Sequence, residues 1–165
     1  MLHSDRITLV PLTPGDLEIY ADSPAKLACQ YGLSDPATLD HETLEALNEC
    51  LLPNIKNPTR EFLFYTMWLV VDHNIKTVVA SLCFHGEPEA GIVEIGYGTS
   101  EKFRNKHYIT EALQLIIGWA KKRTDIRIIT AETEAENLPS QKALRNNRFY
   151  IYNQNDHSIF WKIDV

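Results

Sequence analysis

The chain has 165 residues, 44% of them hydrophobic and 23% charged, with a formal net charge of −6. This length is typical of one domain with its own hydrophobic core, and the negative charge argues against nucleic-acid binding, which needs a basic surface. No stretch has the length and apolarity of a membrane span, and the first residues lack the apolar core of a secretion signal. We therefore expect a cytoplasmic protein that contacts neither nucleic acid nor membrane.

The three cysteines are Cys29, Cys50 and Cys83, which are odd in number and far apart in the sequence. No CxxC pair or Cys/His cluster has the spacing of a metal site. We expect reduced, buried thiols and no bound metal.

The chain begins with a strand and short helices. Alternating, β-branched residues predict a strand over Arg6–Leu12. Asp16 is expected to cap a short helix at 17–20, because aspartate accepts hydrogen bonds from the first N–H groups of a helix. Residues 21–38 have no steady period, so we expect a loop there with one helical turn.

A second helix is expected over Glu42–Leu52, where leucines repeat at helical spacing. Asp40 can cap it, and Pro53 and Pro58 bracket its end.

Three extended runs in the middle of the chain predict an antiparallel meander. The runs cover Phe64–Val71, Thr77–Phe84 and Ile92–Tyr97. A turn at Asp72–Asn74 joins the first two, and a polar connection at 86–91 joins the last two.

A strand, helix and strand follow in the C-terminal half. The helical pattern opens at Thr110 and ends at Lys121–Arg123, and the next strand covers Ile126–Thr133. Since a crossover helix joins parallel strands, this strand should lie parallel to Ile92–Tyr97.

The last elements are a helix and two strands. Asn137 is expected to cap the helix, with Pro139 in its first turn and Leu144 facing inward. The strands cover Phe149–Tyr152 and Ser158–Ile163. Together the elements predict one α+β domain over residues 1–165, with a mixed, mostly antiparallel sheet flanked by helices.

One stretch has the outline of an anion site. The strand Glu94–Thr99 ends in two glycines, a loop with Arg104 and Lys106 follows, and a helix begins near Thr110. A helix N-terminus offers free N–H groups and the positive end of its dipole to a phosphate, and the two cations add charge at the same place.

Four segments, in this order and spacing, resemble the GCN5-related N-acetyltransferases, in particular the branch that modifies N-terminal amines of ribosomal proteins. They are the opening strand Arg6–Leu12, the "EIGY" strand Glu94–Tyr97, the YITEA helix start Tyr108–Ala112, and Asn137–Ser140 with Leu144 and Phe149. The likeness covers nearly the whole chain. It implies a splayed pair of parallel strands, Ile92–Tyr97 and Ile128–Thr133, that forms a cofactor cleft.

The resemblance implies acetyl-coenzyme A as co-substrate. Its pantetheine would pair with the backbone at Tyr97–Thr99 and its pyrophosphate would rest on the loop from Arg104. The cofactor-binding residues implied are Tyr97, Gly98, Thr99, Arg104, Asn105, Lys106, His107, Tyr108, Ile109, Thr110 and Asn137. Asn137 would also look the same as a pure helix cap.

The chain departs from the family at three positions. His107 and Ile109 stand where the pyrophosphate loop usually has small residues, and Arg148 stands where the family favours glycine. Glycine there lets phosphate approach the main chain and frees the backbone dihedrals. These positions motivate an alternative function, a non-catalytic acyl-coenzyme A-binding or scaffolding domain.

Acetyl transfer needs a neutral amine and a donor for the leaving sulfur. Ser140 matches the branch's serine near the thiolate, or it satisfies N–H groups in the first helical turn. Glu94 can take the amine proton directly or through water, or it is a surface carboxylate. Arg145 excludes the tyrosine that many relatives carry after the Leu144 position. Tyr97 is interpreted as a wall of the acceptor cleft or as core.

The resulting hypothesis is an acetyl-coenzyme A-dependent N-acetyltransferase that acts by direct attack of the amine in a ternary complex. The acceptor can be a protein N-terminus, a polyamine or an aminoglycoside-like amine, and the segment Ala21–Pro58 is expected to shape that choice. A homodimer is plausible for the family. The remaining histidines are interpreted as surface residues; they are His41, His73, His85 and His157.

Overall fold

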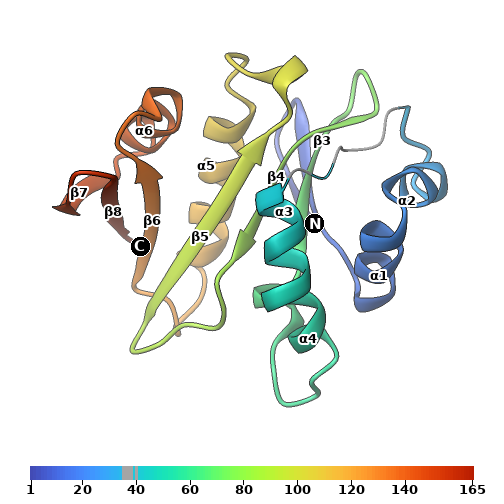
Figure 1. The fold of residues 1–165 in the computed structure, drawn as a ribbon, viewed down its shortest axis with the longest axis horizontal. Coiled ribbons are helices and arrows are strands. Elements are labelled where there is room, and N and C mark those ends of the chain that lie inside the picture. The colour runs from blue at the N-terminus through green and yellow to red at the C-terminus, as the bar shows by residue number, and fades with distance from the viewer. Residues whose placement is uncertain (35–38, 40) are drawn as a thin grey trace.

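The computed structural model describes residues 1–34, 39 and 41–165. Within these residues, eight strands form one sheet in the order β1-β2-β3-β4-β5-β6-β8-β7 (Figure 1). They are β1 (Leu2–His3), β2 (Ile7–Pro11), β3 (Met67–Asp72), β4 (Thr77–Phe84), β5 (Ile92–Thr99), β6 (Ile128–Glu134), β7 (Tyr150–Gln154) and β8 (Ser158–Asp164). All neighbouring pairs are antiparallel except β5 and β6. The α+β prediction, the central meander and the parallel pair are therefore confirmed.

Helices cover both faces of the sheet. They are α1 (Pro14–Asp22), α2 (Pro24–Gln30), α3 (His41–Glu45), the π-helix η1 (Ala46–Leu51), α4 (Leu52–Ile55), the 3₁₀ helices η2 (Phe62–Phe64) and η3 (Glu101–Phe103), α5 (Tyr108–Ala120) and α6 (Leu138–Asn146). In Figure 1, α5 lies behind the sheet, where it packs on β1, β2, β4 and β5, whereas α3 and α4 lie in front.

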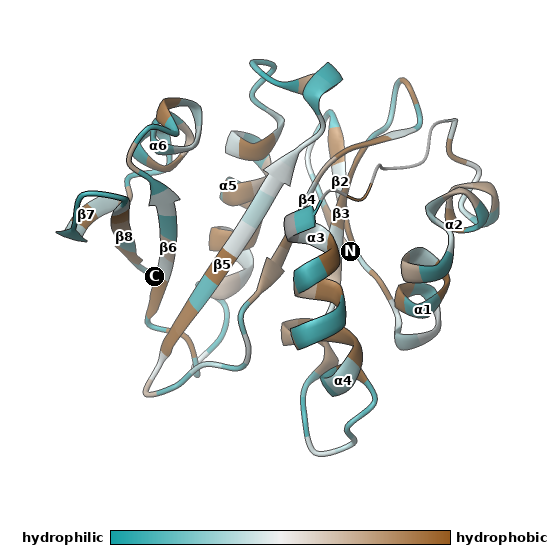
Figure 2. Ribbon diagram, viewed as in Figure 1, coloured by the Kyte–Doolittle hydropathy of each residue, from teal (hydrophilic) through white to brown (hydrophobic). Residues whose placement is uncertain are grey.

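An aromatic cluster holds α5 against the sheet. The ring centroid of Phe84 lies 5.3 Å from that of Phe64 and 6.5 Å from that of Trp68. The ring of Trp119 in α5 lies 5.6 Å from both Trp68 and Phe84. In Figure 2, β4 is brown along much of its length, whereas β5 is brown near its start and pale toward its end. Burial of these large rings supplies much of the hydrophobic stabilisation of the domain.

The first helix is capped differently from the prediction. Thr13, and not Asp16, is the N-cap; Asp16 is the third helical residue and completes a capping box with Thr13. The predicted loop over 21–38 contains the two-turn helix α2. Ser23 caps α2 by accepting a hydrogen bond from the Lys26 N–H, and Pro24 occupies its first turn, a helix-start signal that the sequence interpretation missed.

The helix predicted over Glu42–Leu52 does not end before Pro53. Helical backbone continues from α3 through η1 into α4 as far as Ile55. Pro53 is the second residue of α4 and follows the π-helical turns of η1, where the regular i→i−4 hydrogen-bond pattern is already interrupted, so its missing N–H is tolerated. The predicted cap Asp40 lies outside the described residues.

Other boundaries move by a few residues. Strand β3 begins at Met67 because Phe62–Phe64 forms η2, and α5 begins at Tyr108, two residues before Thr110. The cysteines are free thiols, but only Cys83 is buried, so the expectation of burial was wrong for the exposed Cys29. Across the described ranges, no helix is long and apolar enough to cross a membrane.

Candidate active site

The cleft forms where β5 and β6 separate. Their pairing ends at Glu94 and Thr130, although β5 continues on β4 as far as Thr99. The β6-facing edge of residues 95–99 is therefore free of strand pairing, and a cavity of about 620 Å³ opens there. Gly96, Tyr97 and Gly98 line it together with residues of η1, β4, β6 and α6. Splayed parallel strands, as the family resemblance implied, thus create the cleft.

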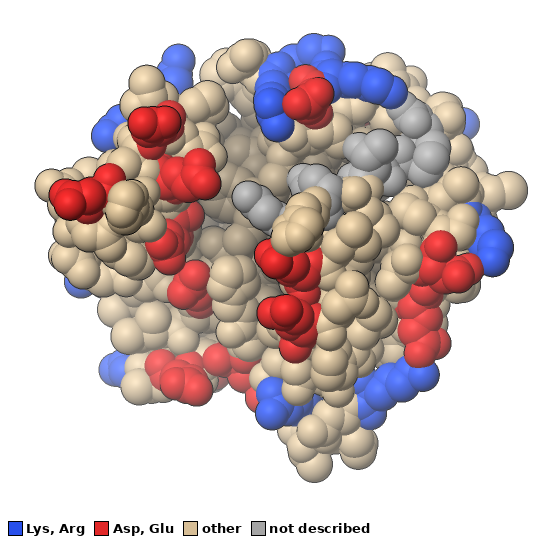
Figure 3. All heavy atoms as spheres, in the orientation of Figure 1, with Lys and Arg blue, Asp and Glu red and all other residues tan. Residues whose placement is uncertain are grey.

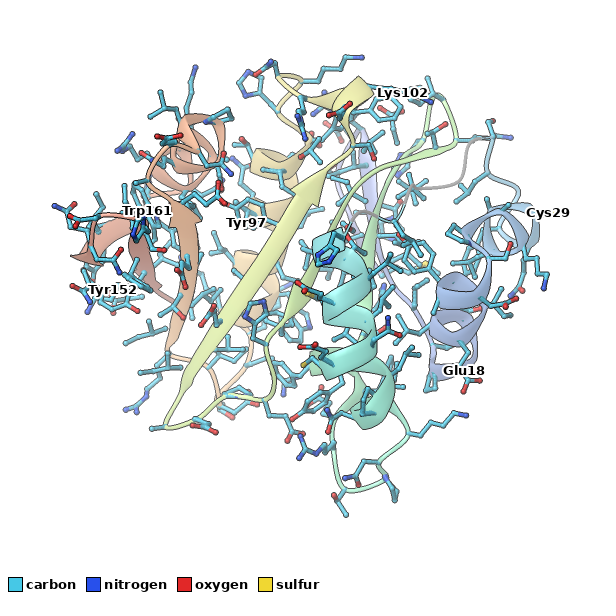
Figure 4. The ribbon with its side chains drawn as sticks, viewed as in Figure 1. Glu18, Cys29, Tyr97, Lys102, Tyr152 and Trp161 are labelled. Atoms are coloured by element: carbon cyan, nitrogen blue, oxygen red, sulfur yellow. The ribbon has the colours of Figure 1, made fainter. Side chains whose placement is uncertain are left out.

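Two side chains meet on the α6 side of this cleft. The Tyr97 hydroxyl lies 2.8 Å from Ser140 Oγ, and Figure 4 shows Tyr97 between β5 and α6. Asn137 is the N-cap of α6, as predicted, and its Oδ1 accepts a hydrogen bond from the Ser140 N–H at 3.1 Å. Burial raises the pKa of Tyr97 to about 12, although the contact with Ser140 opposes the shift. Both hydroxyls therefore stay protonated at neutral pH.

A second pair lies on β4 and β5. The Nδ1 atom of His85 lies 3.0 Å from Glu94 Oε1, and His85 lines the cavity. Hydrogen bonds to Cys83 and to Glu94 raise the pKa of the His85 imidazole to about 10. The hydrogen bond from His85 likewise lowers the pKa of Glu94. At neutral pH the pair is an imidazolium and a carboxylate.

His85 was expected to be an ordinary surface residue, and its position at the cleft was missed. Its side chain is half-exposed, but it faces the cavity between Cys83 and Glu94. Period-two alternation places Ser81, Cys83 and His85 on one face of the extended chain. The antiparallel register then brings His85 opposite Glu94, whose carbonyl accepts the His85 N–H. The expected antiparallel pairing of these two strands was the signal that could have indicated His85 beside Glu94.

Gly96 leaves room for this imidazole. A Cβ atom at residue 96 would lie 2.8 Å from His85 Nε2, so any side chain there must displace the ring. Gly96→Ala is expected to weaken the contact with Glu94 and to lower the pKa of His85, as measured by NMR titration. Gly118→Ala is the control, because a Cβ there meets nothing within 4 Å; it should leave His85 unchanged and stabilise α5 by about 1 kcal/mol. An unaltered pKa in Gly96→Ala would contradict this account.

The loop before α5 presents backbone N–H groups. Asn105 and His107 have φ angles of 61° and 63°, in the left-handed region that glycine adopts without strain. In the part of the chain that the structure describes, no backbone N–H of residues 105–110 donates to a protein acceptor. These free donors lie at the N-terminus of α5, so the loop has the features of an anion site. Arg148, at a third glycine-like position, also has a positive φ of 65°.

Side chains of this stretch divide into two groups. Arg104, Asn105, Lys106 and His107 are exposed, whereas Tyr108 and Ile109 are buried and Thr110 is half-buried. The Tyr108 hydroxyl donates to Asp72 Oδ2 at 2.7 Å, away from the cleft. Tyr108 and Ile109 can therefore bind a ligand only through their backbone. Thr99 is half-buried on β5 opposite Ala80 and is not among the residues that line the cavity.

Arg6, about a hundred residues earlier in the chain, holds the loop in place. Its guanidinium donates to the Lys106 carbonyl at 3.1 Å and to the Glu111 carboxylate at 2.7 Å, and lies 4.3 Å from the Tyr108 ring centroid.

Besides the Tyr108 hydroxyl, Asp72 accepts a hydrogen bond from the N–H of Asn74 at 2.8 Å. Burial alone would raise the pKa of Asp72, but these hydrogen bonds lower it.

The two ends of the cleft carry opposite charges. The cavity lining includes four carboxylates and no lysine or arginine among the described residues; they are Glu45, Glu49, Glu132 and Glu134. Figure 3 shows acidic residues on both sides of the hollow and basic residues around η3 and the loop that follows it. One end therefore favours anions and the other favours cations. No cluster of three or more potential ligands for a metal ion occurs among the described residues.

The chain matches known proteins over most of its length. Residues 6–150 match the family model described as "Acetyltransferase (GNAT) domain". An uncharacterized N-acetyltransferase of Bacillus subtilis (strain 168), YjdG, is 34% identical over 121 residues, which are 73% of this chain and 69% of that protein.

Solved structures share the fold at lower identity. The ribosomal-protein-S5-alanine acetyltransferase of Vibrio fischeri has a TM-score of 0.67 and 15% identity, over 98% of this chain and 94% of its own. The ribosomal L7/L12 alpha-N-protein acetyltransferase RimL, in complex with coenzyme A, has a TM-score of 0.65 and 19% identity, over 98% and 96% of the two chains.

Proposed function

Because this chain belongs to the GNAT acetyltransferase family, a family of acyltransferases, we propose that it moves an acetyl group from acetyl-coenzyme A to an amine by direct attack in a ternary complex. One observation carries the proposal. The pair Tyr97–Ser140 and the pair His85–Glu94 reach the same cavity from α6 and from β4. A donor group and a proton-accepting group therefore flank the point where the strands separate.

The residues of the cleft fit acetyl-coenzyme A, which supplies an activated acetyl thioester. The unpaired edge of β5 at Tyr97 and Gly98 offers backbone groups to the pantetheine amides. The free N–H groups at residues 105–110 suit the pyrophosphate, and the exposed Arg104 and Lys106 add positive charge. Asn137 also lines the cavity, and its side chain accepts the hydrogen bond from the Ser140 N–H.

The reaction forms one bond and breaks one. The amine nitrogen bonds to the acetyl carbon, the carbon–sulfur bond breaks, and its electron pair goes to sulfur. The amine loses one proton and the sulfur gains one. Glu94, the unprotonated member of its pair, takes the amine proton through water, because it is not among the residues that line the cavity. The charged His85 holds this carboxylate in place, and Ser140 donates a hydrogen bond to the departing sulfur.

The acidic lining supports an acceptor that is cationic in solution. An ammonium group is attracted by Glu45 and Glu49 on one wall and by Glu132 and Glu134 on the other. The ammonium must lose a proton before it attacks, and the ionised Glu94 carboxylate accepts that proton through water. A protein N-terminus, a polyamine and an aminoglycoside-like amine all meet this requirement.

Isothermal titration with acetyl-coenzyme A tests the proposal. We expect a dissociation constant in the micromolar range, about −8 kcal/mol. His107→Gly reports on the altered loop: glycine removes a left-handed strain of about 1 kcal/mol, so the fold should persist. Similar affinity in both proteins would mean that His107 is compatible with phosphate. A gain in His107→Gly would mean that the imidazole crowds it.

Absence of binding in both proteins would overturn the proposal and leave the scaffolding alternative. Binding without thiol release, across protein N-termini, polyamines and aminoglycosides, would leave the non-catalytic acyl-coenzyme A-binding domain.

A further inference from the structure

Among the described residues, one side chain contacts the Ser140 hydroxyl, and it comes from β5. The Tyr97 hydroxyl lies 2.8 Å from Ser140 Oγ but 3.5 Å from the Ser140 carbonyl oxygen. We propose that Tyr97 is a positioning residue that donates its proton to Ser140 Oγ and so directs the serine hydroxyl proton at the sulfur of coenzyme A. This inference rests on the proposed function, because it assigns a role at the same site.

The two possible directions of this hydrogen bond leave different protons free. Each has one proton and two acceptor lone pairs. If Tyr97 donates to Oγ, the serine proton is left free for the cavity; if the serine donates to Tyr97, no serine proton remains for sulfur. Burial, which raises the pKa of Tyr97 to about 12, keeps the phenol protonated throughout the working range. A hydroxyl that accepts a hydrogen bond also becomes a stronger donor.

Within the described ranges, no side chain other than Tyr97 contacts the Ser140 hydroxyl. Among the described residues, the other contact of Ser140 is the backbone N–H that Asn137 caps, and it does not touch Oγ. Arg145 lies one turn along α6, but its guanidinium packs over the Trp161 ring at 5.1 Å. Without Tyr97, a serine in the first helical turn can bond to a backbone carbonyl of its own chain instead of facing the cleft.

The first test measures binding and needs no acceptor. Titrations of coenzyme A and desulfo-coenzyme A at about pH 9, where the thiol ionises, give an affinity ratio that isolates the sulfur contact. We expect wild type to prefer coenzyme A about tenfold. Ser140→Ala should abolish the preference, Tyr97→Phe should remove most of it, and the double variant should match Ser140→Ala. Tyr152→Phe is the control, because Tyr152 is exposed on β7.

The second test measures turnover with an accepted amine. Ser140→Ala is expected to lower kcat about 100-fold and Tyr97→Phe about tenfold, with KM for acetyl-coenzyme A unchanged. Because Tyr97 acts through Ser140, the double variant should be no slower than Ser140→Ala. Additive losses, or a Tyr97→Phe protein equal to wild type in both ratio and kcat, would overturn the inference.

The outcomes separate this inference from the proposed function. A wild type that binds coenzyme A without turnover contradicts the enzymatic function, but the affinity ratio still decides the role of Tyr97. A wild type that binds neither ligand contradicts both.

Discussion

Replacing Glu94 with glutamine is expected to lower kcat/KM for the amine about 100-fold while leaving acetyl-coenzyme A affinity unchanged. The carboxylate lies 3.0 Å from His85 Nδ1 and favours the charged imidazolium. Its loss lowers the pKa of His85 from about 10, so the basic limb of the pH profile of kcat/KM should move to lower pH. His85→Asn should remove that limb. Steady-state kinetics over a pH series measure both effects.

The same variants provide a readout of stability. Native His85 has a pKa of about 10 against 6.5 for the unfolded group, so the native state binds more protons between these values. Its contribution is therefore complete below pH 6.5 and is lost as pH rises toward 10. Thermal melts of Glu94→Gln should show a smaller loss over this range than wild type. His157→Asn, on the exposed turn between β7 and β8, is the control; an unchanged profile in Glu94→Gln would refute the pairing.

Replacing Asp72 with alanine is expected to destabilise the protein by about 3 kcal/mol and to weaken acetyl-coenzyme A binding. The carboxylate is buried and accepts from the Tyr108 hydroxyl and from the turn N–H of Asn74. Its removal leaves the Tyr108 hydroxyl without a partner at the first residue of α5, directly after the loop that offers its N–H groups. Melting should shift by roughly 6 to 12 °C.

Two comparisons make this result specific. Asp72→Asn keeps an acceptor for the Asn74 N–H and places an NH2 group that can donate to the Tyr108 hydroxyl, so it should cost less than alanine. Asp156→Ala removes an exposed carboxylate from the turn before β8 and should leave both stability and binding unchanged. A melting temperature that is equal in Asp72→Ala and wild type would contradict the anchoring role.

Elements with strong periodicity were predicted well, whereas several short-range signals at helix ends were misread. The meander β3-β4-β5 and the parallel β6 follow from extended runs and one crossover. The prolines were harder to interpret. Pro24 starts a helix in a predicted loop, because the first helical turn requires no N–H there. Pro53 continues a helix that was predicted to end, because it follows the π-helical turns of η1.

By itself, the sequence determined most of the strands and helices, the parallel pairing of β5 with β6, and the N-cap Asn137, because these depend on periodicity, on one crossover and on residues three apart. The separation of β5 from β6 was implied by the family resemblance. Only the tertiary structure decided the side-chain pairs that the proposed mechanism uses. Tyr97 meets Ser140 across 43 positions, and His85 meets Glu94 through the register of β4 and β5. Contacts between distant residues depend on how strands are aligned and helices packed, which no local pattern of residues specifies.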